Sequence, residues 1–181
     1  DRIARGEPHT WRLDSGRAAE LCGKLTFHDL LCGPRPVLPG DLGDVVLARR
    51  DIATSYHLAV VVDDAHQGIT NIVRGYDLLD NTPWQQQLQA ALSLPTPRYL
   101  HLPLVVTTDG QKLSKQNLAP ALAEESTGIR RQLFQALQLL DQAPPPALVD
   151  ESPEAQLRWA IENWSVSRLA PLAHRPTPPE Q

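Results

Sequence analysis

The stretch Leu58-Ala59-Val60-Val61-Val62-Asp63-Asp64 decides the fold class of this chain. It includes three consecutive valines, and β-branched side chains pack well on a pleated sheet. A run that is apolar on both faces is typical of a central strand covered by helices on both sides, as in parallel sheets. The aspartates would then lie at the carboxyl end of the strand, where open α/β sheets bind their ligands. The sequence therefore predicts an α/β fold with a parallel sheet.

The two aspartates are not expected to act together. Neighbouring residues of a strand point to opposite faces, so Asp63 and Asp64 would not form an acid–base pair. At most one of them would face an active-site cleft, and the other would cap backbone groups.

Further strands are predicted on both sides of the central run. Val45-Val46-Leu47-Ala48 precedes it, and residues 99–106 follow it. Residues 1–43 are rich in glycine, proline and charge, which is typical of short strands and turns. Together with the central run, these segments predict an α/β unit that ends near residue 116.

A helix is predicted between the last two strands. Thr82-Pro83-Trp84-Gln85 offers a capping hydroxyl, a proline at the first helical position and a glutamine that completes a capping box. Four apolar residues then share one face at helical spacing, with the first two assigned to the core: Trp84, Leu88, Ala91 and Leu92.

The last third of the chain predicts helices only. One amphipathic helix carries Ile129, Leu133, Leu137 and Leu140 on one face, and three prolines at 144–146 end it. A second helix begins at Ser152-Pro153, and its apolar face comprises Leu157, Ala160, Ile161 and Trp164. We therefore expect an α/β part over residues 1–116, a small helical subdomain over 117–168 and a flexible, proline-rich tail over 169–181.

Composition restricts the function only mildly. The chain has 181 residues, a net charge of −4 and 41% hydrophobic residues, which is ordinary for a globular protein. The acidic total argues against a protein that coats nucleic acid by charge alone, although a local basic face would still permit a tRNA enzyme. No stretch is long and apolar enough for a membrane span and no secretion signal is visible, so we expect a cytoplasmic protein without membrane contact.

The two cysteines predict neither a disulfide framework nor a metal site. Cys22 and Cys32 are expected to be reduced thiols, with a single bridge as the alternative. His28 lies between them, but the spacing matches no familiar zinc-finger pattern.

The most specific motif is Gln111-Lys112-Leu113-Ser114-Lys115-Gln116-Asn117, which follows the turn Thr108-Asp109-Gly110. Two lysines three positions apart in a loop after a strand bring mobile positive charge to a nucleotide's phosphates, and Ser114 adds a hydroxyl donor. Such charge would stabilise a departing pyrophosphate. From these residues alone, a solvated surface loop remains the alternative.

This motif resembles the second signature of class I aminoacyl-tRNA synthetases, in the form used by the glutamyl branch. His101-Leu102-Pro103-Leu104 before it resembles the same branch, as do residues 55–64 (SYHLAVVVDD) and 68–75 (GITNIVRG). Residues 25–29 (LTFHD) fit more weakly. The blocks agree in order and spacing over residues 44–122, so the resemblance implies part of a Rossmann-like catalytic domain.

The resemblance also implies roles for individual residues. Lys115 would bind ATP and act in catalysis with Lys112, and the ATP-binding loop would comprise Lys112, Leu113, Ser114, Lys115 and Gln116. Tyr56 and Arg74 would contact glutamate, and a guanidinium suits this role because it can grip a carboxylate with two parallel hydrogen bonds. The residues alone leave alternatives open: Tyr56 as a packing residue, and Arg74 in an ion pair with Asp77 or Asp80.

The residues after the motif indicate a particular member of the branch. Only 181 − 116 = 65 residues remain after Gln116, too few for a full anticodon-binding region. Residues 115–122 (KQNLAPAL) also resemble glutamyl-queuosine tRNA(Asp) synthetases. The resemblance implies ATP and Mg²⁺ as cofactors, and L-glutamate and a queuosine-bearing tRNA(Asp) as partners. Glutamate would form glutamyl-adenylate, and a queuosine hydroxyl would then take the glutamyl group as AMP leaves.

The chain departs from the family in several respects. The first, His-x-Gly-His-like ATP signature and the zinc module of longer relatives are not found, and Ile52 stands where the family usually has glycine. The chain has no methionine, even at its start. We therefore expect an incomplete part of the enzyme whose partner would be a missing N-terminal segment. The alternatives are a truncated glutamyl-tRNA synthetase that charges the tRNA 3′ end and a non-catalytic tRNA-binding module.

Overall fold

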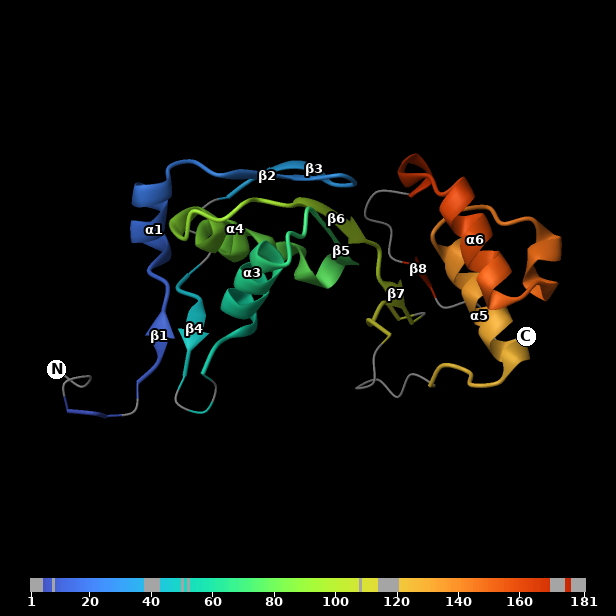
Figure 1. Cartoon of the computed structure of the whole chain (residues 1–181), viewed down its shortest axis with the longest axis horizontal. Coiled ribbons are helices and arrows are strands. Elements are labelled where there is room, and N and C mark those ends of the chain that lie inside the picture. The colour runs from blue at the N-terminus through green and yellow to red at the C-terminus, as the bar shows by residue number, and fades with distance from the viewer. Residues whose placement is uncertain are drawn as a thin grey trace. The chain divides into compact units, whose positions relative to one another are not determined.

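A computed structural model describes residues 5–7, 9–37, 43–49, 51, 53–107, 109–113, 121–169 and 175–176. The chain divides into two compact units, Asp1–His101 and Leu102–Gln181 (Figure 1). This division falls earlier than the boundary that we expected at residue 116.

A four-stranded mixed sheet forms the centre of the first unit. Its strand order is β3-β2-β6-β5, from β2 (Thr26–Asp29), β3 (Gly33–Pro36), β5 (Asn71–Gly75) and β6 (Arg98–Leu102). β2 and β3 form an antiparallel hairpin, whereas β2 and β6 run parallel, with Asp29 opposite Tyr99. The sheet brings Asp29 at the end of β2 next to Tyr99 near the start of β6, although 70 residues separate them in the sequence.

A second, two-stranded sheet pairs β1 (Trp11–Arg12) with β4 (Val46–Ala48) in antiparallel fashion. The β4 strand lies within the predicted strand 45–48. Helix α1 (Ser15–Cys22) follows β1 and begins at Asp14, whose Oδ1 accepts a hydrogen bond from the amide of Arg17 at 2.8 Å. A carboxylate at this position satisfies an otherwise unpaired amide of the first helical turn.

Residues 58–62 form a helix, so the strand predicted there is wrong. α3 (Tyr56–His66) begins at Ser55, whose hydroxyl accepts from the amide of Leu58 at 3.3 Å. The periodicity of a short apolar run does not distinguish a strand from a buried helix. The length of the segment does, because α3 has eleven residues and strands are usually shorter. The run is not buried all round either, because Val61 is 2% exposed whereas Val62 is 43% exposed.

The helix start predicted at Thr82 is also organised differently. The 3₁₀ helix η1 (Tyr76–Asn81) runs directly into α4 (Thr82–Ala91), so α4 has no free first turn for a capping box to satisfy. The hydroxyl of Thr82 instead lies 3.3 Å from the carbonyl oxygen of Leu78. Pro83 does occupy the first turn, as predicted.

The predicted apolar face of α4 is only partly buried. Leu88 is 3% exposed, but Leu92 is 47% exposed and Trp84 is half-buried at the surface. Helix α4 packs against both α1 and α3, so its other sides are buried as well. Four glutamines are enclosed in this way: Gln85, Gln86, Gln87 and Gln89.

The hydrophobic core of the first unit lies between the β2–β3 hairpin, η1 and β6. Its buried members are Phe27, Val37, Leu79 and Tyr99. The rings of Phe27 and Tyr99 meet edge to face, with centroids 6.0 Å apart. This core fixes the strands that carry the polar groups of the site.

The second unit contains a two-stranded parallel sheet and a helical part. It comprises β7 (Val105–Val106), β8 (Arg175–Pro176), α5 (Ser126–Leu139), η3 (Pro146–Asp150), α6 (Pro153–Asn163) and η4 (Val166–Arg168). Both predicted helices are confirmed, and the Ser152 hydroxyl caps α6 by accepting from the amide of Ala155 at 3.2 Å. Helices α5 and α6 pack together, but Leu157 and Ile161 remain 51% and 81% exposed.

Polar side chains tie the helical segments to one another. The Gln156 amide is fully buried and donates to the carbonyl oxygens of Arg130 and Glu151 at 3.2 and 3.3 Å. Gln142 accepts from the amide of Ser165 at 2.9 Å. In the described residues, no helix has the length and apolar character needed to cross a membrane. The predicted tail, residues 169–181, lies largely outside the described residues.

Candidate functional site

The lysine motif begins on a hairpin of the second unit. The amide of Leu113 donates to the carbonyl oxygen of Val105 at 2.9 Å, and Lys112 forms an antiparallel β-bridge with Val106. Gly110 closes the turn with a φ of 84°, a left-handed value that favours glycine. The next three motif residues, Ser114, Lys115 and Gln116, lie outside the described residues, as does Ile52.

Tyr56 lies at the start of α3 on the wall of a cavity of about 440 Å³. Its ring is 52% exposed and meets His57 edge to face at 5.7 Å, and His57 in turn meets Trp84 at 5.5 Å. Tyr56 therefore lies at the surface of the first unit and is not part of its buried core. The remaining lining residues are Arg12, Asp44, Val45, Val46, Ala48, Arg49, Thr54 and Ser55.

The cavity combines aromatic walls with charged residues of both signs, since Arg12, Arg49 and Asp44 line it. Arg12 donates to the carbonyl oxygen of Asp44 at 3.0 Å, and Arg49 pairs with Asp51 at 2.9 Å. Trp84 donates its indole N–H to the carbonyl oxygen of Gly43 at 3.1 Å, which orients the ring as a wall. Such a lining suits a small ligand with flat and charged groups.

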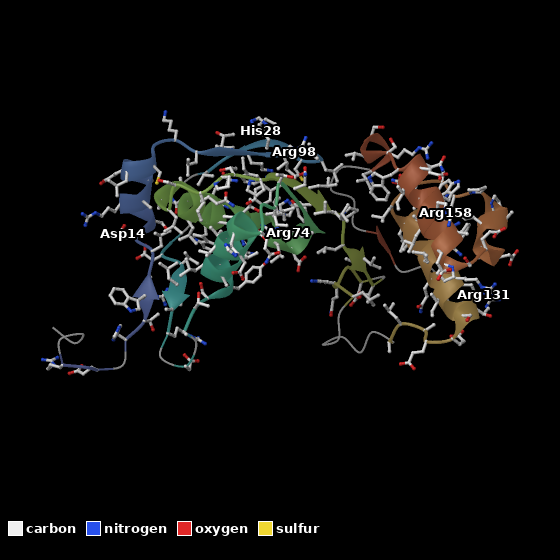
Figure 2. The ribbon with its side chains drawn as sticks, viewed as in Figure 1. Asp14, His28, Arg74, Arg98, Arg131 and Arg158 are labelled. Carbon is white, nitrogen blue, oxygen red and sulfur yellow. The ribbon has the colours of Figure 1, made fainter. Side chains whose placement is uncertain are left out.

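Arg74 extends from β5 into the first unit, where its hydrogen bonds go to neutral groups. Its Nε donates to Nε2 of His101 at 3.0 Å, and its Nη2 donates to Oγ1 of Thr82 at 2.8 Å and to the carbonyl oxygen of Leu78 at 3.3 Å. Figure 2 shows Arg74 in the middle of this unit, whereas Asp14 lies at its edge. Arg74 thus makes these bonds in place of the ion pair with an aspartate of residues 77–80 that the sequence left open.

These contacts leave Nη1 for a ligand. Arginine has five N–H donors, of which Nε has one and Nη2 has two. In the described part of the chain these three are occupied, and Nη1 has no hydrogen-bond partner. A side-on, two-nitrogen grip on a carboxylate would therefore require Arg74 to release one of its internal bonds.

His101 links Arg74 to a buried carboxylate. Its Nδ1 lies 2.7 Å from Oδ2 of Asp29, and both side chains are 0% exposed. Burial lowers the pKa of His101, the hydrogen bond to Asp29 opposes this change, and the charge of Arg74 adds to it. The lowered pKa favours the neutral imidazole.

Asp29 is stabilised in its charged form by donors on all sides. Burial by itself would raise the pKa of Asp29, but hydrogen bonds from the amides of Cys32 and Leu31 and from His101 outweigh it and lower the pKa. These amides lie 2.7 and 2.9 Å from Oδ1. The carboxylate thus closes the β2–β3 turn and reaches β6 at the same time.

Tyr99 packs the other side of this group. Cζ of Arg74 lies 5.4 Å from the centre of its ring, and the His101 ring is stacked on it at 6.0 Å with an interplanar angle of 7°. Gln89 donates to the Tyr99 hydroxyl at 3.0 Å. A cation over an aromatic face is favourable, and more so away from water.

Asp64 is the acidic neighbour of this group. Because α3 is a helix, Asp63 and Asp64 do not point to opposite faces of a sheet, but their surroundings still differ: Asp63 is exposed and Asp64 is half-buried. Burial raises the pKa of Asp64, the charge of Arg74 lowers it, and Asp63 raises it again.

The structure places two of the predicted residues, Tyr56 and Arg74, in one unit but in different surroundings. His57 lies near both residues. Its ring meets the Tyr56 ring edge to face, and burial and the charge of Arg74 lower the pKa of His57. Arg74 does not line the cavity that Tyr56 lines. Lys112 belongs to the second unit.

Sequence reasoning missed the group that holds Arg74. Asp29 and His101 lie in segments that resemble the family, but no role was predicted for them. Thr82 was predicted to cap a helix. The usable signal was a carboxylate in the block of residues 25–29 together with a histidine on the predicted strand 99–106. Among the described residues, no group of three or more His, Cys, Asp or Glu side chains could hold a metal ion, and both cysteines are free.

Solved structures identify the class of this fold. The glutamate tRNA ligase from Elizabethkingia meningosepticum, in complex with its amino acid, superimposes with a TM-score of 0.70 over 97% of this chain and 38% of that one, at 20% identity. The glutamate-tRNA synthetase from Elizabethkingia anophelis gives a TM-score of 0.67 with the same coverage and identity. The fold is that of a class I synthetase catalytic domain.

Residues 1–141 match the family of tRNA synthetases class I (E and Q), catalytic domain, and the chain belongs to this family. It is 42% identical over 181 residues to the glutamyl-Q tRNA(Asp) synthetase of Thiobacillus denitrificans, in an alignment that covers 98% of this chain and 56% of that protein. The enzymes of the same name from Aromatoleum aromaticum and Chromobacterium violaceum are each 46% identical, over 87% and 90% of this chain and 48% and 52% of theirs. The chain thus spans about half the length of the curated relatives it matches.

Proposed function

We propose that the protein carrying this chain activates glutamate with ATP and transfers the glutamyl group to the queuosine of tRNA(Asp). The observation that carries the proposal is the 42% identity to a glutamyl-Q tRNA(Asp) synthetase over 98% of the chain. This similarity spans both units rather than the catalytic fold alone.

Arg74 and Tyr56 are the proposed glutamate ligands. The two N–H groups of Arg74 Nη1, which have no partner among the described residues, suit a carboxylate oxygen, and a charge-assisted hydrogen bond of this kind is strong in a half-buried setting. Tyr56 presents an exposed ring and hydroxyl on the wall of the cavity. Together they would orient the amino acid for attack, which is most of what such an enzyme contributes.

The lysine motif is the proposed ATP site. Lys115, helped by Lys112, would neutralise the phosphates as the α-carboxylate of glutamate attacks the α-phosphorus and pyrophosphate leaves. A queuosine hydroxyl would then attack the acyl carbon and release AMP. Leu113, Ser114 and Gln116 complete the loop, and Mg²⁺ bound to ATP would share the charge stabilisation.

The proposed partners follow from this reaction. They are L-glutamate, a queuosine-bearing tRNA(Asp) and the further part of the enzyme that the longer relatives possess. Two free cysteines fit a reducing compartment, so we place the reaction in the cytoplasm.

The test is glutamate-dependent ATP–pyrophosphate exchange, measured on this chain and on a form extended to the length of the curated relatives. Family resemblance implies that queuosine enzymes activate glutamate without tRNA, whereas glutamyl-tRNA synthetases need tRNA bound. Exchange without tRNA supports the proposal, with aspartate and glutamine as matched substrate controls. Exchange that requires tRNA would point to a truncated glutamyl-tRNA synthetase, and no exchange under either condition would point to a non-catalytic tRNA-binding module.

A further inference from the structure

We propose that His101 is a positioning residue that aims the guanidinium of Arg74 at the ligand, because Asp29 fixes it as the neutral Nδ1–H tautomer. The identity of the ligand as glutamate rests on the proposed function. The orientation of Arg74 rests on the hydrogen bonds alone and can be tested separately.

The partners of His101 permit one tautomer only. Oδ2 of Asp29 can only accept, so Nδ1 at 2.7 Å must carry a hydrogen. Nε of Arg74 can only donate, so Nε2 at 3.0 Å must offer a lone pair. A doubly protonated imidazole would lose this acceptor and place two cations in contact.

His101 has little freedom to turn. Its side chain is fully buried, and its own amide donates to the same Asp29 oxygen at 3.0 Å. Its ring is parallel to the ring of Tyr99, with centroids 6.0 Å apart, and Gln89 donates to the Tyr99 hydroxyl. Asp29 is fixed in turn by two amides of the β2–β3 turn.

The fixed position of His101 also restricts the guanidinium of Arg74. His101 holds its Nε, and Thr82 and the Leu78 carbonyl hold its Nη2, so two edges of the planar guanidinium are tied to the protein. The corner at Nη1 is left to the ligand. A carboxylate that binds there meets a donor already in place, which removes the cost of ordering a long side chain on binding.

Two substitutions separate the two halves of this role. In His101→Asn, the short amide can still donate to Asp29 but leaves Nε of Arg74 without its acceptor. In His101→Gln, the longer side chain can supply an oxygen near the former Nε2 position. His28→Asn is the matched control, because His28 is an exposed histidine of β2.

In the form that shows exchange activity, we expect His101→Asn to raise the glutamate KM about tenfold or more, the effect of losing one hydrogen bond from a charged donor. His101→Gln should raise the glutamate KM less. In both variants the ATP KM and kcat should stay within about twofold, because the lost interaction stabilises bound glutamate equally in the ground state and the transition state. A glutamate KM unchanged in His101→Asn, while Arg74→Ala raises it, would overturn the positioning role.

A second measurement does not depend on activity. In the ¹⁵N-labelled 181-residue chain, the hydrogen bond should give a nitrogen–nitrogen coupling between Arg74 Nε and His101 Nε2, with the imidazole proton on Nδ1. A proton on Nε2, or no coupling, would overturn the inference. If the coupling is present but Arg74→Ala leaves the glutamate KM unchanged, the proposed role of Arg74 in glutamate binding fails while the geometry stands.

Discussion

Replacing Asp29 by asparagine tests the centre of this site with the smallest possible change in shape. Asp29 accepts four hydrogen bonds: from the amides of Leu31 and Cys32 on Oδ1, and from the amide and Nδ1 of His101 on Oδ2. An asparagine oxygen can keep the first two. Its NH₂ group then faces two other donors on His101, so both bonds on that side are lost.

The magnitude follows from the number and kind of bonds. A hydrogen bond to a charged group contributes about 1.5–3 kcal/mol, and buried donors left without partners add a desolvation penalty. Two such bonds within one network are not additive, so we expect the free energy of unfolding to fall by about 3–5 kcal/mol. Against a typical total of about 5–15 kcal/mol, this is a large fraction.

The assay is urea unfolding at about pH 7.5, followed by far-ultraviolet circular dichroism. The matched control is Asp14→Asn, the same chemical change at an exposed helix cap, where asparagine serves as well as aspartate. The control should lie within about 0.5 kcal/mol of the parent chain. If Asp29→Asn were as mild as this control, Asp29 would not be the anion that organises His101, and the tautomer argument would lose its basis.

Three further predictions concern the catalytic loop, the buried histidine and a cysteine. Lys115→Ala in the active form should reduce glutamate-dependent ATP–pyrophosphate exchange by orders of magnitude with unchanged unfolding, and full activity would refute the placing of the ATP site. The pKa of His101 is lowered in the folded state, so its contribution to stability is present above the unfolded pKa near about 6.5 and is lost as pH falls. Urea titrations should therefore show stability falling below about pH 6.5, by at most about 1.4 kcal/mol per pH unit for this group, and less steeply in His101→Asn. Burial and the neighbouring Asp29 raise the pKa of Cys32 to about 11, so its alkylation rate, read by mass spectrometry, should rise about tenfold per pH unit between about pH 8 and 10, and a plateau near about pH 9 would contradict this.

Local signals predicted the second unit well. The spacing of Ile129, Leu133 and Leu137 indicated α5, and Ser152 followed by proline indicated the start of α6. Each of these helices has an ordinary start or a clear apolar period, so the information lies within a few residues. The same holds for β4 of the first unit, a short apolar strand.

The misassigned segment at residues 58–62 shows where such signals compete. Its valines favour a strand, but the Ser55 hydroxyl three positions before Leu58 is a helix start, and this cap is the feature that the structure uses. At Thr82 the reverse occurred, because a residue with the chemistry of a cap bonds to Arg74 and Leu78 instead. In both places the surroundings, not the residue type, decide how the hydroxyl is used.

The group around Arg74 could not be predicted, because its members are far apart in the sequence. His101 lies 72 residues from Asp29 and 27 from Arg74, and they become neighbours because β6 lies between β2 and β5 in the sheet. Hydrophobic periodicity predicts which residues are buried, but it does not predict which buried groups contact one another. A polar residue on a predicted strand was therefore interpreted as part of a motif, without its partner.

Stability alone does not explain why this group is polar. Replacing a buried charged network by apolar side chains of similar volume is often neutral or stabilising, whereas removing one member is costly. Asp29 and His101 therefore leave the first unit dependent on every bond they make. Their hydrogen bonds orient the guanidinium of Arg74. An apolar neighbour could enclose the aliphatic part of this side chain but could not fix the plane of its guanidinium. A side chain that must present one chosen corner to a carboxylate needs an acceptor at a defined place, and a histidine locked in one tautomer is such an acceptor.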